Sequence, residues 1–235
     1  MPESRIIQER VDLNVNDGTR MSAYVARPGD RDAHSGIIIL QEAFGVNSHI
    51  RDVADRSARE GYLAVAPELF HRTAPGFEGD YNNFPSVAPH MKAVTVPGAE
   101  ADLRAAYEWL LSQKVVKQKI FSVGFCMGGR MSYLANSILP LAKAVSFYGG
   151  GIAPDFLDRA PNLHGRMLFF WGGLDKHITA EKRRAVADAL TAAGKQFVHV
   201  EFSNADHGFF CDERAAYQPQ ASREAWALVQ EFLRD

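Results

Sequence analysis

The chain has 235 residues, of which 46% are hydrophobic and 23% are charged, and its formal net charge is -2. This length and composition are typical of a globular protein with one sizeable core, so we expect a single domain over residues 1–235. The near-neutral charge argues against a nucleic-acid-binding protein, which needs a basic surface, and against electrostatic docking on an anionic membrane.

The chain has two cysteines, Cys126 and Cys211, which are too few for a disulfide framework. The first residues are charged and lack the apolar segment of a secretory signal. No run approaches the roughly 18 apolar residues of a membrane-spanning helix. We therefore expect a cytoplasmic protein whose cysteines are reactive or buried rather than paired.

The first predicted elements are a hairpin, then a strand, a helix and a strand. Asp17-Gly18 separates two strand-like runs and is a common hairpin turn. The β-branched run Ile37-Ile38-Ile39 predicts a strand buried on both faces. Apolar residues at helical spacing follow and stop at Gly61, which favours a helix end. The predicted ranges are 8–15, 21–26, 36–40, 47–60 and 63–66, of which 47–60 is the helix.

An irregular stretch rich in proline and glycine, residues 70–98, interrupts this pattern, and we expect an excursion or lid there with at most short helices. Beyond it, helices and strands alternate. The expected helices are 99–113, 127–136, 180–193 and 214–233, and the expected strands are 119–123, 142–147, 167–171 and 197–202. This alternation predicts an α/β fold, a mostly parallel twisted sheet with helices on both faces. Ligands of such sheets bind beyond the carboxyl ends of the strands.

The strongest motif follows the strand 119–123. Gly124-Phe125-Cys126-Met127-Gly128-Gly129 leads from this strand into a helix, which is the G-x-S-x-G nucleophile elbow with cysteine in place of serine. Glycines are needed because the turn leaves no room for side chains beside the neighbouring strand and helix. The thiol is held at a helix N-terminus, which favours the thiolate. A buried structural cysteine is the alternative, and the strand–turn–helix context favours a nucleophile.

A thiol of ordinary pKa needs a base and an acid that orients the base. Of the eight histidines, His207 is the best candidate, because it follows the strand 197–202 through a short loop. Asp175 follows the strand 167–171 and is the first choice for the acid. Asp206 ranks second, because neighbours in sequence seldom point at one another. The chain order nucleophile, acid, histidine is that of α/β-hydrolases.

An oxyanion hole of this kind uses the N–H group after the nucleophile and one from the loop after an early strand. These are the amides of Met127 and Ala43. The loop that carries Ala43 also places Glu42 where a carboxylate would lie close to the thiol. A solvated loop glutamate is the alternative for Glu42.

These motifs resemble the dienelactone hydrolase family from about residue 8 to the C-terminus. The matching segments are Gln41-Glu42-Ala43-Phe44-Gly45-Val46-Asn47, the elbow, Asp175 after Gly172-Gly173, and Asp206-His207-Gly208-Phe209, with Tyr148-Gly149-Gly150-Gly151 as a further loop. The resemblance implies an α/β-hydrolase fold and a triad of Cys126, His207 and Asp175. It also implies that Glu42 pairs with the resting thiol. The family opens the lactone of carboxymethylenebutenolide to maleylacetate.

The sequence departs from the family at one substrate anchor. Family members hold the substrate carboxylate with arginines, one of which lies four residues after the histidine. That position is Cys211 here. Arg72, in the excursion, and Arg214 are candidate replacements, and a solvated surface arginine is the alternative for each. The departure leaves the hydrolase chemistry in place and opens the question of the substrate.

The resulting hypothesis is a hydrolase that opens a small ester or lactone, with anionic substrates included, through a Cys126 thioester. A general carboxylesterase or thioesterase is one alternative. A non-catalytic redox sensor, with Cys211 as resolving thiol for Cys126, is another. No residues show metal-ligand spacing and no glycine motif fits a nucleotide, so we expect neither metal nor cofactor. Nucleic acid and membrane are not expected partners, and we expect a monomer or small homo-oligomer.

Overall fold

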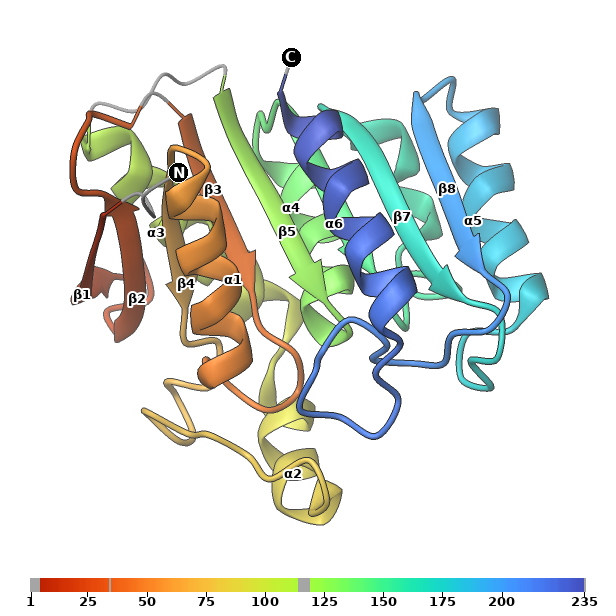
Figure 1. Cartoon of the computed structure of the whole chain (residues 1–235), viewed down its shortest axis with the longest axis horizontal. Coiled ribbons are helices and arrows are strands. Elements are labelled where there is room, and N and C mark those ends of the chain that lie inside the picture. The colour runs from red at the N-terminus through yellow and green to blue at the C-terminus, as the bar shows by residue number, and fades with distance from the viewer. Residues whose placement is uncertain (1–4, 34, 114–118, 235) are drawn as a thin grey trace. The chain divides into compact units, whose positions relative to one another are not determined.

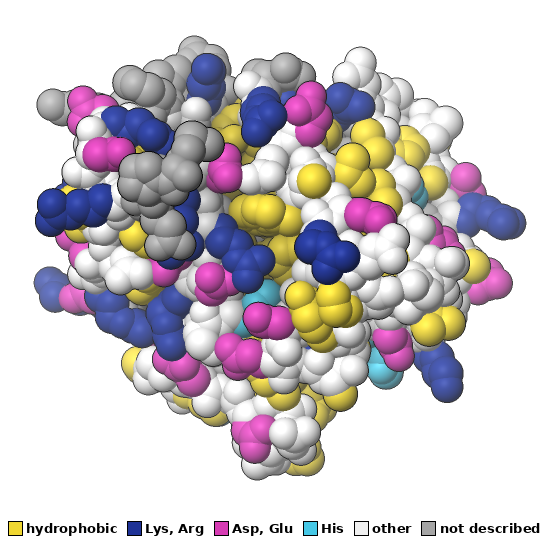
Figure 2. Space-filling view, in the orientation of Figure 1, with side chains coloured by type: hydrophobic (Ala, Val, Ile, Leu, Met, Phe, Trp, Pro, Cys, Tyr) yellow, Lys and Arg dark blue, Asp and Glu magenta, His cyan; other side chains and the backbone are white. Residues whose placement is uncertain are grey.

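The computed structural model describes residues 5–33, 35–113 and 119–234. The chain divides into two compact units, residues 1–122 and 123–235. The single domain expected over the whole chain stays a prediction. Figure 2 shows basic and acidic side chains interspersed over the visible face, in keeping with the near-neutral net charge.

The first unit contains a hairpin followed by a parallel strand pair. In strand order β1-β2-β4-β3, the first two pairings are antiparallel, and β3 pairs with β4 in parallel. Gly18 has a φ of +86° in the turn between the first two strands, as the Asp-Gly signal predicts. The strands are β1 (Ile6–Asn14), β2 (Arg20–Pro28), β3 (Ser35–Leu40) and β4 (Tyr62–Pro67).

Three helices complete this unit: α1 (Ser48–Arg59), α2 (Phe84–Ala93) and α3 (Val96–Ser112). Helix α1 begins where the Asn47 side chain accepts the N–H of Ile50, and its apolar face packs against β2 and β4. Helix α3 packs against β1 and β4. Figure 1 shows α1 in front of these strands and α3 behind them.

The excursion is more helical than expected. Helix α2 lies wholly within residues 70–98 and spans 10 residues. Helix α3 begins at Val96 rather than at residue 99, because the Thr95 side chain accepts the N–H of Gly98 and Pro97 falls in the first turn, where its missing N–H costs nothing.

The second unit carries the strand order β5-β6-β7-β8, of which β6, β7 and β8 are mutually parallel. Helix α4 packs against β6 and α6 against β7. Figure 1 shows α6 in front of these strands and α4 behind them. The elements are β5 (Ile120–Phe125, which enters this unit at Val123), α4 (Met127–Ile138), β6 (Lys143–Phe147), the 3-10 helix η2 (Leu157–Asn162), β7 (Arg166–Gly172), α5 (Ala180–Ala192), β8 (Phe197–Phe202) and α6 (Pro219–Leu233).

The start of the last helix was predicted wrongly. It begins at Pro219, not at residue 214. The Gln218 side chain accepts the N–H groups of Gln220 and Ala221, and Pro219 occupies the first helical position. Arg214 therefore lies in a series of turns after the histidine loop. None of the helices formed by the described residues has the length and hydrophobicity of a membrane span.

Candidate active site

Cys126 lies between the end of β5 and the first residue of α4. Its φ of 54° and ψ of -113° are rare for a residue with a side chain, and such conformations cost about 1–3 kcal/mol. The surrounding main chain holds it in place. Its N–H donates to the carbonyl of Phe147 at 3.0 Å, and its carbonyl accepts from Gly129 at 3.0 Å and Arg130 at 3.3 Å. The thiol is partly exposed at the helix N-terminus.

The glycines of the elbow are explained by close main-chain contacts. A Cβ on Gly124 would lie 1.9 Å from the carbonyl oxygen of Gly128. A Cβ on Gly129 would lie 2.6 Å from the carbonyl oxygen of Phe147. Both distances are well inside van der Waals contact, so the turn closes only without these side chains.

His207 lies in the loop after β8, with its ring between a sulfur and a carboxylate. Its Nε2 is 3.1 Å from the Sγ of Cys126, and its Nδ1 is 2.7 Å from Oδ2 of Asp175. Asp206, the second candidate for the acid, accepts the main-chain N–H of His207 at 2.6 Å. The carboxylate that faces the ring is therefore that of Asp175, which lies after β7.

The Asp175 carboxylate is buried and fully engaged. Its Oδ1 accepts the main-chain N–H groups of His177 at 2.8 Å and Ile178 at 3.1 Å, which leaves Oδ2 for the imidazole. Burial alone would raise the pKa of Asp175. The hydrogen bonds from His207 and from these amides outweigh burial and hold the pKa below its ordinary value.

The charge of the imidazole follows from its two neighbours. Burial of the ring lowers the pKa of His207, but the electrostatic interaction with Cys126 and the hydrogen bond to Asp175 outweigh burial and raise it to about 10. At neutral pH the ring is therefore an imidazolium, and it lies between the sulfur of Cys126 and the carboxylate of Asp175. An imidazolium within hydrogen-bond distance of a cysteine sulfur places a proton donor beside a candidate nucleophile.

Two further side chains border the imidazole. The buried ring of Tyr148 lies 5.1 Å from that of His207, and the exposed ring of His177 lies 6.0 Å from it at an interplanar angle of 83°. The sequence singled out Tyr148 only as part of a glycine-rich loop. The sequence analysis did not select His177, although its position two residues after the acid could have indicated it. The amide N–H groups that bind Asp175 belong to the main chain, so no residue type in the sequence could have indicated them.

Comparison with known proteins adds the family. The sequence model of the dienelactone hydrolase family matches residues 21–235. This chain belongs to the dienelactone hydrolase family. A relative from Synechocystis, provisionally named carboxymethylenebutenolidase, is 34% identical over 228 residues, which is 93% of each chain. Membership in the dienelactone hydrolase family supports a hydrolase that acts on an ester or a lactone.

Solved structures agree with this assignment. A crystal structure from Klebsiella pneumoniae, provisionally named dienelactone hydrolase, matches with a TM-score of 0.89 and 29% identity over 97% of this chain and 98% of that chain. An esterase from Thermogutta terrifontis matches with a TM-score of 0.66 and 20% identity over 99% of this chain and 94% of that chain. The latter match shows the fold alone. This dienelactone hydrolase family member has the α/β-hydrolase fold, as the sequence implied.

The predicted loop residues Glu42 and Ala43 belong to the first unit of this family member. They lie just after β3, separated from it by Gln41, in the loop where the second oxyanion donor was expected. Both are 1% exposed. Glu42 is therefore not a solvated loop glutamate.

Arg72 has two carboxylate partners within the first unit. Its guanidinium donates to both oxygens of the buried Asp102 at 2.8 Å, and to Oδ2 of Asp17 at 2.6 Å. Partners in this geometry account for most of its donors. These contacts favour a structural role for Arg72 over the predicted role in binding a substrate carboxylate.

Arg214 lies against the histidine loop. A Cβ on Gly208, which has a φ of +85°, would be 2.1 Å from Nη1 of Arg214 and 2.3 Å from its Cζ. The guanidinium therefore lies directly on the main chain of the residue after His207. The side chain is partly exposed.

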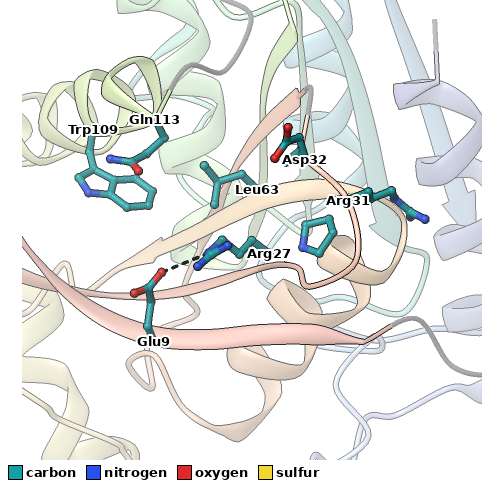
Figure 3. A pocket seen from close by; sticks show the side chains of 9 residues that line it. Glu9, Arg27, Arg31, Asp32, Leu63, Trp109 and Gln113 are labelled. Carbon is teal, nitrogen blue, oxygen red and sulfur yellow. Dashed lines mark hydrogen bonds and ion pairs between the residues drawn. The ribbon is translucent and has the colours of Figure 1, made fainter.

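The first unit also contains a cleft of about 430 Å³, shown in Figure 3. Trp109 and Leu63 line it together with charged side chains, among which Arg27 contacts Glu9 at 3.5 Å. None of the residues that line this cleft is a predicted site residue, and none is adjacent in the sequence to Cys126, Asp175 or His207. The candidate active site of this family member is the elbow with its histidine and aspartate.

Proposed function

We propose that this protein hydrolyses small esters or lactones through Cys126, with His207 and Asp175 completing a triad and a thioester as the intermediate. One observation carries the proposal: the His207 ring is within hydrogen-bond distance of the Cys126 sulfur, at 3.1 Å, and of the Asp175 carboxylate, at 2.7 Å. Cys126 itself lies on a strained turn at a helix N-terminus. This is the geometry that nucleophilic catalysis requires.

In the first half-reaction the Cys126 thiolate adds to the carbonyl carbon. The negative charge moves to the carbonyl oxygen, where the N–H of Met127, the first residue of α4, stabilises it. The C–O bond to the leaving group then breaks, and Nε2 of the His207 imidazolium gives its proton to the departing alkoxide. A lactone leaves its hydroxyl on the same molecule as the thioester.

In the second half-reaction the neutral imidazole takes a proton from water as the water oxygen adds to the thioester. Collapse of this adduct breaks the C–S bond and returns the thiolate beside an imidazolium. The new carboxylic acid loses its proton to solvent, so one water is consumed and one proton is released. The predicted roles of the Ala43 amide as second oxyanion donor and of Glu42 as partner of the resting thiol complete the proposal and stay predictions.

The substrates we propose include esters and lactones that carry a carboxylate. The Arg214 guanidinium, packed on Gly208, supplies a positive charge beside the histidine loop, and a guanidinium binds carboxylate with two parallel hydrogen bonds. It would replace the anchor that is absent at Cys211. A general esterase without this preference is the second candidate.

Replacement of the nucleophile tests the reaction. Cys126→Ala should lower kcat for a small aryl ester and an unsaturated lactone by about 10³-fold or more, because the covalent route is removed. Wild-type protein with a slow substrate should also gain the acyl mass on the peptide that contains Cys126. Unchanged turnover in Cys126→Ala would end the proposal. A protein that hydrolyses neither substrate but is oxidised at Cys126 by mild peroxide would be the redox sensor instead.

Removal of the proposed anchor tests the substrate class. Arg214→Gln should lower kcat/KM for a carboxylate-bearing lactone by about 10- to 100-fold, since a hydrogen bond to a charged group contributes about 1.5–3 kcal/mol. The neutral ester should be hydrolysed at the wild-type rate. Arg223→Gln, an exposed arginine on α6, is the matched control. An equal loss for both substrates would remove Arg214 from the proposal.

A further inference from the structure

We propose that Tyr81 is a positioning residue for the Ala43 loop, defined as residues 41–47, so that contacts from the excursion hold the Ala43 amide in the orientation that an oxyanion donor needs. The inference rests on the proposed function, in which the Ala43 amide is the second oxyanion donor. It adds a role for the excursion, residues 70–98, which no step of the mechanism has used so far.

The first support is a direct contact between two main-chain segments of the first unit. The N–H of Gly79 donates to the carbonyl of Phe44, the residue after Ala43, at 3.0 Å. Gly45 has a φ of +83°, and a Cβ there would lie 1.9 Å from the carbonyl oxygen of Phe77. The excursion and the loop therefore meet with no side chain between them.

Tyr81 contacts the loop at two points. Its ring lies 4.5 Å from the ring of Phe44, and its Oη accepts a hydrogen bond from Nδ2 of Asn47 at 2.8 Å. The other end of the Asn47 amide is fixed as well, because Oδ1 accepts the N–H of Ile50 in the first turn of α1. Tyr81 thus joins the residue after Ala43 to the last residue of the loop and, through Asn47, to a helix.

Apolar packing also holds the excursion against the Ala43 loop. Ala43, Phe44 and Val87 of α2 form a buried cluster, against which Phe77, Tyr81 and Met91 of the excursion pack. Ala43 has no polar side chain with which to hold itself, so the orientation of its peptide depends on these neighbours. An ion pair between Arg51 and Glu78, in which Arg51 also donates to the carbonyl of Val46 at 2.7 Å, ties the loop to the excursion a second time.

The positioning role predicts a different kinetic result from a simple cover over the substrate. A cover contributes to substrate binding, so damage to it raises KM. An oxyanion donor acts on the charge that develops in the transition state, so loss of its alignment lowers kcat and leaves KM unchanged. Alkylation of the Cys126 thiolate by iodoacetamide creates no oxyanion, so a change confined to the alignment of the Ala43 amide should leave the alkylation rate unchanged.

The experiment compares Tyr81→Phe, which deletes a single oxygen, with Asn47→Ser, which keeps an oxygen able to cap α1 but cannot reach Tyr81. We expect kcat for a neutral aryl ester to fall about tenfold in each, which is less than the 10²- to 10³-fold loss of a whole oxyanion donor. KM and the rate of iodoacetamide alkylation should match the wild type. The double variant should be no slower than the slower single variant, since both remove the same bond.

The matched control is Phe84→Ser, at a side chain of α2 that is 48% exposed, and it should have wild-type kinetics. A kcat for Tyr81→Phe within twofold of the wild type would overturn the inference, and so would a parallel fall in the alkylation rate. These results leave the proposed function standing if the wild type is active and Cys126→Ala is not. A wild-type protein without hydrolase activity would overturn both proposals.

Discussion

The pKa of His207 is set by what lies on either side of its ring. Burial acts to lower it, yet the Cys126 sulfur and the Asp175 carboxylate raise it to about 10, against about 6.5 for a histidine in an unfolded chain. Between these two pH values the folded protein binds a proton that the unfolded chain does not. The resulting stabilisation is fully present below pH 6.5 and is lost as the pH rises through about 10.

Asp175→Asn should move the basic limb of the activity profile to lower pH. The amide cannot stabilise the imidazolium as a carboxylate does, so the pKa of His207 falls and the proton donor is lost earlier as pH rises. Loss of orientation should also lower kcat, by about 10²- to 10⁴-fold. The measurement is kcat/KM for a neutral ester from pH 5 to 11. A limb that stays near the wild-type position would show that the carboxylate does not set this pKa.

Residue identity and spacing were enough to predict which three residues the structure brings together. Cys126 and His207 each follow a predicted strand, and parallel strands place such residues at one edge of a sheet. The sequence could not predict the hydrogen bonds that distinguish the role of Asp175 from that of Asp206. These bonds depend on the local main-chain geometry, in which the Asp206 carboxylate accepts the N–H of His207. The same holds for Arg72, whose partners lie 30 and 55 residues away in the chain.

At the scale of elements, glycines are required for two different reasons. In the elbow between β5 and α4 neighbouring atoms leave no room for a side chain, whereas in other turns only the left-handed backbone conformation favours glycine. Gly124 would place a Cβ 1.9 Å from the Gly128 carbonyl. Gly194, which ends the α5 segment, has a φ of +64° but nothing within 4 Å of an added Cβ. Strands and helices with clear hydrophobic periodicity, such as β3 and α1, were predicted almost to the residue. The start of α6 was not, because a side-chain cap and a proline decide it.

Gly124→Ala and Gly194→Ala should therefore separate the two effects. Gly194→Ala should lower the free energy of unfolding by about 1–2 kcal/mol, the strain of a left-handed alanine. Gly124→Ala should cost more than this and abolish hydrolysis, because the turn must open to relieve the clash. Urea denaturation with a parallel activity assay measures both. Equal costs at the two positions would contradict the crowding of the elbow.

At the scale of the whole chain, side-chain interactions join parts of the first compact unit that lie far apart in the sequence. In the first unit, Arg72 joins the turn after β1, through Asp17, to α3, through Asp102. Burial raises the pKa of Asp102 in opposition to its bonds with Arg72, so this carboxyl relies on its partner. Alternation of helices and strands predicted the α/β class correctly, but the excursion has no such periodicity, and its contacts with the Ala43 loop could not be predicted from the sequence.

Arg72→Gln should reduce stability rather than substrate binding. It leaves the buried Asp102 without its guanidinium partner, and breaking a buried pair in this way costs about 3–5 kcal/mol. Thermal unfolding should show a lower Tm. At temperatures below the unfolding transition of the variant, its KM for a carboxylate-bearing lactone should equal that of the wild type. A raised KM with an unchanged Tm would restore the sequence prediction that Arg72 binds the substrate carboxylate.

The unequal burial of the two thiols has a practical consequence. Cys126 is partly exposed, whereas Cys211 is fully buried and neither is in a disulfide. A chromogenic thiol reagent should therefore consume one equivalent per folded chain and two after denaturation. The reading for the folded chain therefore counts the chains whose Cys126 thiol is intact and accessible, without the use of any substrate.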